Sequence, residues 1–261
     1  MPSILSRRAF PGPALDVVAA GGSFVGQATF HGAVVCCLRP RAEIAAMLPP
    51  ELELVANVSA TPDLHPIVFI LGAQTAGATI VGGRSVPLGI RYGEFALAVP
   101  FVRHAGGTHL HAWIPAMVSG YAPATWSGNR LYGFSKRMGD VRRDGSFLLV
   151  TAEEQALLLY ATLEPRGAWS AGGDAELPAL GFVREAFALP VVGRRADGAW
   201  ACSYFGWDFR AARVRAADAC VSVERPIVAG LPLGDYHDST AGTFEVEGML
   251  WRLTWPMPCR C

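Results

Sequence analysis

Short apolar runs, bounded by glycine, proline or aspartate, make up most of this chain. Segments 34–38, 67–71, 95–102, 147–151 and 156–163 are rich in branched or aromatic residues and have the length of strands. Segment 198–224 alternates apolar and polar residues, as half-buried antiparallel strands do. Segment 146–165 resembles two strands that fold back at residues 152–154, although its Glu, Gln, Ala and Leu content also favours a helix. The pattern predicts a β-rich protein.

One helix is indicated near the start of the chain, within residues 39–52. Pro40 suits a first helical turn, and Ile44, Met47 and Leu48 are spaced to share one face. The pair Pro49-Pro50 would end this helix. The predicted fold class is therefore mostly β (α+β), a closed antiparallel barrel or sandwich with a few helices, in a single domain spanning residues 1–261.

Composition limits the classes of partner. The formal net charge is zero, which gives no electrostatic basis for binding nucleic acid or an anionic membrane surface. The longest apolar runs are too short to cross a bilayer, and the first residues lack the continuous apolar core of a secretory signal. We therefore expect a cytoplasmic protein whose six cysteines are free thiols.

Two local motifs suggest other chemistries. Tyr132 and Lys136 have the spacing of the catalytic pair of short-chain dehydrogenases, which would need both residues on one helical face, but Gly133 disfavours a helix there. His109 and His111 would share one strand face, but no third ligand has recognisable spacing. The sequence predicts no metal site and leaves the dehydrogenase as a minor alternative.

Lys136 is the single lysine of the chain, since the other 21 of the 22 basic residues are arginine. Arginine retains its proton, so it cannot replace a lysine that acts as a nucleophile. In an extended segment Tyr132, Phe134 and Lys136 would share one face, because side chains alternate along a strand. An apolar setting of this kind favours the neutral amine that a nucleophile needs. Arg137 would point to the opposite face.

Three segments resemble the acetoacetate decarboxylase family. GNRLYGFSKRMGDV is similar to the segment that carries the family's Schiff-base lysine, which places Lys136 in that role and Arg137 where a second cationic lysine usually stands. IRYGEFALAV resembles a Tyr-x-Glu strand whose glutamate lies in the active site, which points to Glu94. CLRPRAEIAAMLPPELEL is similar to a strand, short helix and Leu-Pro turn near the family's start. The order of these pieces holds from about residue 25 to about residue 255.

The resemblance implies a β-cone or barrel with flanking helices, a homo-oligomer, and a lyase that uses no cofactor. The implied substrate is a keto acid or ketone, with Lys136 and Glu94 catalytic. The candidate substrate-binding residues are Tyr92, Tyr132, Phe134 and Arg137. A non-catalytic small-molecule-binding barrel of the same fold is the alternative from another class.

The sequence also departs from the family pattern. Gly128-Asn129-Arg130 replaces the usual Gly-Arg-Glu, and Ser135 replaces a proline. The family's early arginine aligns near Phe30 or His31, and a further active-site glutamate aligns near Ile70. Arg91 or Arg130 could supply a cation from another direction. These losses favour aldolase or dehydratase chemistry over decarboxylation of acetoacetate, because loss of carbon dioxide needs the carboxylate held in place.

Overall fold

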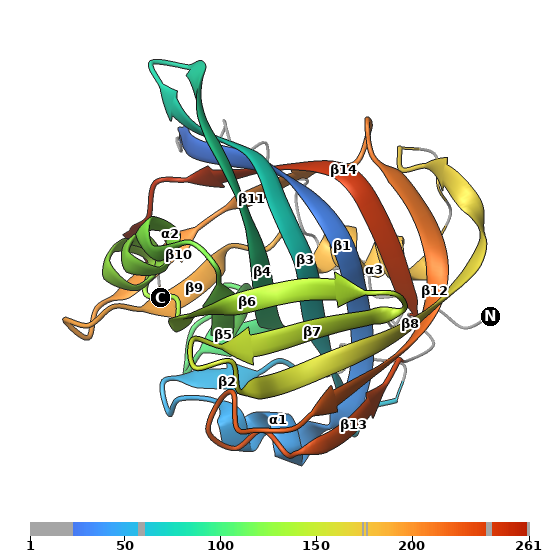
Figure 1. Ribbon diagram of the computed structural model, residues 1–261. Helices are drawn as coiled ribbons and strands as arrows, with labels where there is room; N and C mark the ends of the chain where they lie inside the picture. The colour runs from blue at the N-terminus through green and yellow to red at the C-terminus, as the bar shows by residue number, and fades with distance from the viewer. Residues whose placement is uncertain (1–22, 57–60, 174, 176, 239–241, 260–261) are drawn as a thin grey trace.

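The computed structural model describes residues 23–56, 61–173, 175, 177–238 and 242–259. Within these residues, fifteen strands belong to one curled sheet (Figure 1). The strands are β1 (Phe24–Pro40), β2 (Leu52–Leu54), β3 (Leu64–Val81), β4 (Arg84–His104), β5 (His111–Ser119), β6 (Lys136–Asp144), β7 (Phe147–Ala152), β8 (Leu157–Ala171), β9 (Val191–Arg194), β10 (Trp200–Ser203), β11 (Phe205–Asp208), β12 (Arg213–Val223), β13 (Gly234–His237), β14 (Thr243–Thr254) and β15 (Met257–Pro258). The helices are α1 (Arg41–Met47), α2 (Ala122–Ser127), the single π-helical turn η1 (Gly128–Tyr132), and α3 (Pro178–Ala186).

The sheet closes on itself, because β4 pairs with β5 as well as with β3. The ring follows the order β5, β6, β7, β8, β12, β14, β1, β3 and β4. Its pairs are antiparallel except β5–β6, and β9 joins β5 from outside the ring in a second parallel pair. Figure 1 shows β6, β7 and β8 crossing in front of β1, β3 and β4. The mostly β, barrel-like fold expected from the sequence is confirmed.

Residues 33–37 of β1, 65–72 of β3 and 95–102 of β4 are buried on both faces of the sheet, which explains their continuous apolar runs. Val35, Phe69 and Leu97 belong to one hydrophobic cluster, whereas their neighbours Val34 and Val68 belong to a second cluster. The second cluster packs against α3 and β11. Alternation along each strand therefore sends side chains into two separate cores.

The helix expected within residues 39–52 is confirmed as α1. Pro40 precedes its first turn, and Ile44 and Met47 are buried. The π-helical turn η1 and the helices α2 and α3 were not predicted. No helix in the described part of the chain is long and apolar enough to span a membrane.

Segment 146–165 forms the two strands β7 and β8, so the helical alternative for this segment is wrong. The reversal includes Gln155, whose φ of 62° lies in the left-handed region. The register runs from Phe147 opposite Thr162 to Thr151 opposite Leu157. The local propensity of this segment suits both a helix and strands, so its pairing with neighbouring strands determines the structure that it adopts.

The cysteines correct one expectation. Cys202 and Cys259 form a disulfide that ties β10 to the end of the chain across 57 positions. The prediction of free thiols is therefore wrong for this pair, which local sequence could not reveal because the two residues lie far apart. Cys37 and Cys220 are thiols, and Cys261 lies outside the described residues.

Two buried histidines predict a loss of stability in mild acid. Burial lowers the pKa of His65 and of His111 to about 4. Both imidazoles protonate near pH 6.5 in the unfolded chain, so their contribution to stability is complete above that pH and is lost as the pH falls from 6.5 to 4. At pH 5 each histidine should lower the free energy of unfolding by about 2 kcal/mol relative to pH 7.

Urea denaturation of the wild type and of His111→Gln at pH 7 and pH 5 measures this effect. The wild type should lose about 2 kcal/mol more than the variant between the two values. An identical loss in both proteins would contradict the assignment of this proton to His111.

Candidate active site

The centre of the candidate site is an ion pair between the single lysine and one glutamate. Nζ of Lys136 lies 2.7 Å from Oε2 of Glu94. The two side chains are 9% and 12% exposed, so the pair is largely withdrawn from water. The structure brings together the two residues that the sequence proposed as catalytic.

Strand β5 sets the separation of these two groups. It lies between β4 and β6 in the ring, with Ser119 opposite Glu94 and Met117 opposite Lys136. Lys136 is the first residue of β6 and reaches across β5, as a long side chain can. The pair therefore spans the position where the ring closes.

The segment before β6 fixes the backbone of the lysine. The Asn129 side-chain amide donates to the Lys136 carbonyl oxygen at 2.9 Å, and the Lys136 N–H donates to Asn129 Oδ1 at 2.7 Å. These two hydrogen bonds give Asn129 a structural role at a position where the sequence departs from the family pattern. Gly128 leaves space for the lysine, because a Cβ there would lie 2.7 Å from Lys136 Cδ.

A chain of hydrogen bonds orients the glutamate. Gln74 on β3 donates to Glu94 Oε1 at 3.2 Å, and the Trp251 indole on β14 donates to Gln74 Oε1 at 2.5 Å. Glu94 is thus held through both oxygens, by the amine on one side and the amide on the other. Sequence reasoning missed Gln74 and Trp251, because no local motif links residues 177 positions apart.

Glu94 also faces a small cavity of about 40 Å³. The cavity is lined mainly by apolar and aromatic side chains, including Phe30, Ile70, Met117 and Trp251. A space of this size holds one or two water molecules and no larger ligand. Lys136 is not among the lining residues of this cavity, whereas its ion-pair partner Glu94 is.

Phe30 and Ile70 lie near the positions where the family pattern has an arginine and a glutamate. Both side chains line this small cavity, which we call the inner cavity. His31 lies elsewhere, with Nε2 3.1 Å from Thr75 Oγ1 and Nδ1 accepting from the Gly248 N–H. Arg91 and Arg130 are exposed and line no part of this cavity.

The segment YGFSK is not a continuous strand, which corrects the expected shared face. Tyr132 ends the π-helical turn, Gly133 has a φ of 71°, and the strand begins only at Lys136. The rings of Tyr132 and Phe134 stack at 5.4 Å within a hydrophobic core. The helical turn that a dehydrogenase would need between Tyr132 and Lys136 is also absent, and the dehydrogenase alternative is therefore wrong.

The other two candidate substrate contacts lie at different distances from the site. Arg137 donates to the carbonyl of Ile227 and does not line the inner cavity. Tyr92 lies two residues before Glu94 and stacks on Tyr121 at 5.5 Å. Desolvation, with the Glu94 carboxylate as a smaller cause, raises the pKa of Tyr92. A substrate-binding role for Tyr92, Tyr132, Phe134 and Arg137 stays a prediction.

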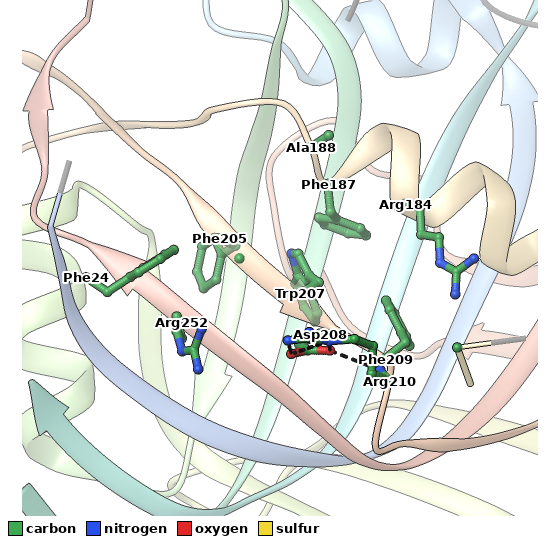
Figure 2. A pocket seen from close by; sticks show the side chains of 12 residues that line it. Phe24, Arg184, Phe187, Ala188, Phe205, Trp207, Asp208, Phe209, Arg210 and Arg252 are labelled. Carbon is green, nitrogen blue, oxygen red and sulfur yellow. Dashed lines mark hydrogen bonds and ion pairs between the residues drawn. The ribbon is translucent and has the colours of Figure 1, made fainter. Parts of the chain in front are cut away.

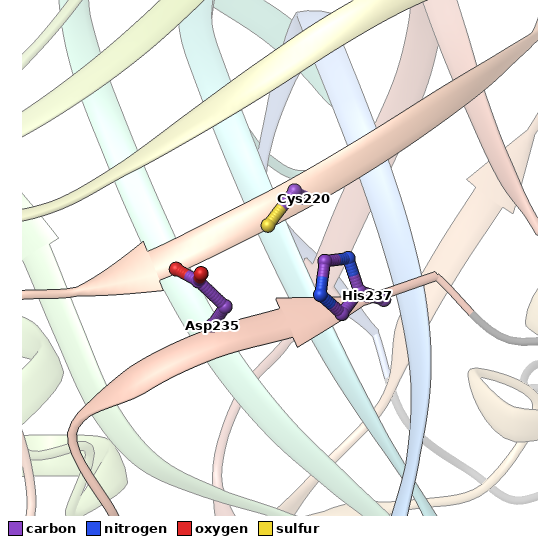
Figure 3. Close-up of side chains that lie close together, drawn as sticks. All are labelled: Cys220, Asp235 and His237. Carbon is purple, nitrogen blue, oxygen red and sulfur yellow. The ribbon is translucent and has the colours of Figure 1, made fainter.

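The possible metal ligands fall in two places. His111 is buried, with its ring 5.6 Å from that of His104, whereas His109 is exposed. Cys220, Asp235 and His237 gather on β12 and β13 with ligand atoms within 4.8 Å of one another (Figure 3). Burial raises the pKa of the Cys220 thiol, and the Ser222 hydroxyl donates to Asp235 Oδ1. We assign no metal to this cluster.

Comparison with solved structures identifies the fold as that of acetoacetate decarboxylase and similar enzymes. The chain resembles acetoacetate decarboxylase from Legionella pneumophila with a TM-score of 0.56 and 15% identity, covering 92% of this chain and 89% of that one. It resembles an acetoacetate decarboxylase-like enzyme from Sphingomonas wittichii with a TM-score of 0.58 and 14% identity, covering 91% and 94%. The enduracididine biosynthesis enzyme MppR, in complex with pyruvate, gives 0.58 and 14%, covering 90% of each chain. No family model and no curated sequence matches the chain.

The fit between Gly128 and the lysine can be tested by one substitution. In Gly128→Ala the new methyl group would meet Lys136 Cδ and Cε, at 2.7 and 3.1 Å, and displace the amine from Glu94. Because flexible side-chain atoms are displaced, the fold should survive while the 2.7 Å contact between Lys136 Nζ and Glu94 Oε2 is lost. A crystal structure of the variant measures the separation of these two atoms.

Gly181→Ala is the matched control, since a Cβ at Gly181 on α3 meets no atom within 4 Å. This variant should keep the wild-type separation of the two atoms. An unchanged separation in Gly128→Ala would show that Gly128 does not position the lysine.

Proposed function

We propose that the protein is a lyase-type enzyme that forms a Schiff base between Lys136 and a ketone or keto acid. The observation that carries this proposal is the placement of the single lysine, which is largely buried and 2.7 Å from Glu94. Glu94 in turn lines a small, mainly apolar cavity. A buried ion pair contributes little net stability in most proteins, because desolvation opposes the attraction. A pair retained in such a place is therefore better explained by chemistry than by folding.

Glu94 supplies the proton transfers in this mechanism. It takes one proton from the Lys136 ammonium, and the neutral amine adds to the substrate carbonyl to give a carbinolamine. Glu94 then returns a proton to the carbinolamine hydroxyl, which leaves as water, and the iminium forms. The hydrogen bond from Gln74 keeps the carboxylate in position throughout.

The iminium can withdraw electrons from the adjacent carbon in several reactions. Decarboxylation requires a substrate carboxylate fixed beside that carbon, which a cation or donor array normally provides. The inner cavity has Phe30 and Ile70 where the family pattern has charged residues, and no arginine among its lining residues. This wall supports aldol or dehydration chemistry over loss of carbon dioxide.

A non-catalytic binding barrel is the second candidate, since a small-molecule cavity alone would fit it. The enzyme and the binding protein differ in what they require of the Lys136 amine. A binding protein needs no nucleophile beside a proton acceptor, whereas an enzyme of this kind needs both.

The remaining expectations concern assembly and location. A homo-oligomer is supported by Val81, Val86 and Leu88, which are exposed on the β3–β4 hairpin, because exposed apolar side chains of this kind suit a protein contact. The cytoplasmic location stays a prediction. The Cys202–Cys259 disulfide is a feature more common in oxidising compartments.

Borohydride trapping tests the proposed amine directly. Incubation with acetoacetate or pyruvate, followed by borohydride, should add the mass of the reduced ligand to the peptide that contains Lys136. Lys136→Arg should abolish trapping while preserving the fold, because length and charge are kept and nucleophilicity is lost. An unmodified Lys136 across a panel of keto compounds would favour the binding protein.

The reaction that follows the iminium is tested by carbon dioxide release. Acetoacetate should form the iminium but release carbon dioxide slowly, because no cation in the inner cavity holds its carboxylate. Measuring gas release and trapping at the same acetoacetate concentration separates the two steps. Rapid release that is lost in Lys136→Arg would make the protein an ordinary decarboxylase.

A further inference from the structure

A second and larger cavity adjoins the small one beside Glu94. It has a volume of about 550 Å³, which is within the range of small-molecule sites. Phe187, Phe205 and Trp207 line both this outer cavity and the inner one. Among the described residues the two cavities share no other lining residue, so these three aromatic side chains form the wall between them.

The wall belongs to a series of aromatic contacts. Ring centroids lie 5.0 Å apart for Phe187 and Trp207, and 5.9 Å apart for Phe205 and Trp207. Phe205 also stacks on Phe134, just before the strand that begins with Lys136. The Nε1–H of Trp207 is buried and finds no hydrogen-bond acceptor among the described residues, so it is available to a ligand oxygen.

Positive charge is found in the outer cavity and not in the inner one. Arg184, Arg210 and Arg252 line the outer cavity with one acid, Asp208, and in Figure 2 the aromatic rings lie between Arg252 and Arg184. Arg210 is paired with Asp208 at 2.6 Å. The Arg184 guanidinium donates to the Gly172 carbonyl oxygen at 2.7 Å.

Arg252 is the cation that remains available. Within the described part of the chain its guanidinium makes no hydrogen bond or ion pair, and it lies over the Phe24 ring at 5.9 Å from the centroid. The hydrogen bonds from Arg210 and, to a smaller extent, the charge of Arg252 lower the pKa of Asp208 in the same cavity. The neighbouring Trp251 lines the inner cavity and bonds Gln74. Because side chains alternate along a strand, β14 presents Trp251 to one cavity and Arg252 to the other.

This division of charge restricts the substrate. Glu94 is the one ionisable side chain among the lining residues of the inner cavity, so a substrate carboxylate there would be desolvated beside a like charge. In the outer cavity the same carboxylate would meet the planar fork of an arginine, which binds both of its oxygens. Carbonyl and carboxylate thus have separate places on the two sides of the aromatic wall.

We propose that the substrate is an elongated keto acid whose carbonyl reaches Lys136 while its distant carboxylate binds Arg252, with an apolar body passing Phe205 and Trp207. The proposal rests on the Schiff-base function proposed for Lys136. It also requires the rings of the wall to rotate, because the inner cavity of about 40 Å³ cannot accept a carbonyl compound as it stands.

The test uses a series of straight-chain methyl-ketone acids that extend from acetoacetate by added methylene groups, each paired with its uncharged methyl ester. Borohydride trapping at Lys136 gives the half-saturating concentration of every compound. For the acids this concentration should fall by at least tenfold once the chain is long enough to span the wall, and the corresponding esters should show a smaller fall.

Arg252→Gln should raise the half-saturating concentration of the longest acids by about tenfold or more, as expected for a lost charge-assisted hydrogen bond. The same variant should raise the half-saturating concentrations of the esters and of acetoacetate much less than those of the long acids. Arg252→Lys should recover part of the effect through its retained charge. Arg166→Gln is the control, since Arg166 is an exposed arginine on β8 paired with Asp218. Thermal melting confirms that each variant is folded.

The outcomes separate the two proposals. Trapping of short acids with no gain from chain length, or with no effect of Arg252→Gln, would overturn the elongated substrate and leave the Schiff base intact. Failure to trap any carbonyl compound at Lys136 would overturn the proposed function. In that case quenching of tryptophan fluorescence by long saturated carboxylates, with and without Arg252→Gln, still tests the outer cavity, and quenching that does not depend on Arg252 would overturn its assignment.

Discussion

The closure of the barrel is the constraint on which the candidate site depends. Lys136 and Glu94 lie on strands that do not pair with each other, and they meet because β5 pairs with both β4 and β6. A shift of one residue in either pairing would turn one of the two side chains to the opposite face of the sheet. Gly93 also permits the close packing of β4 against β6, since a Cβ there would lie 2.5 Å from the Val141 carbonyl oxygen. The site is thus a property of the ring and not of any one strand.

The surroundings of the ion pair match the demands of proton transfer. A charged pair in an apolar site is stable only when its remaining lone pairs are satisfied, and Gln74 meets this need at Glu94 Oε1. Gln74 is in turn fixed by Trp251, so its amide nitrogen points to the carboxylate. Four residues from four strands therefore share one hydrogen-bonded chain that crosses the barrel.

The sequence predicted what is local and missed what depends on distant contacts. Alternation and apolar runs revealed most of the long strands, and a lysine without any other lysine in the chain drew attention to Lys136. Glu94 came from the resemblance of a short strand. The path from Tyr132 to Lys136 was misjudged, because Gly133 adopts a left-handed conformation that breaks the expected alternation. Gln74, Trp251 and the Cys202–Cys259 disulfide have no local signal, since strand order alone brings their partners together.

The position of β11 supports the proposed access of a substrate from this end of the barrel. Strand β14 pairs with β12 through residues 243–247 and with β11 through residues 250–253. Beyond its pairing with β12, β14 therefore has β11 as its neighbour on that side. Within the described residues β11 has no strand on its other side. The aromatic rings that separate the two cavities are thus carried partly by an edge strand, where side chains can move without breaking ladder hydrogen bonds in the ring. Under the proposed function, this edge would be the part of the molecule through which a substrate passes from the outer cavity to the inner one.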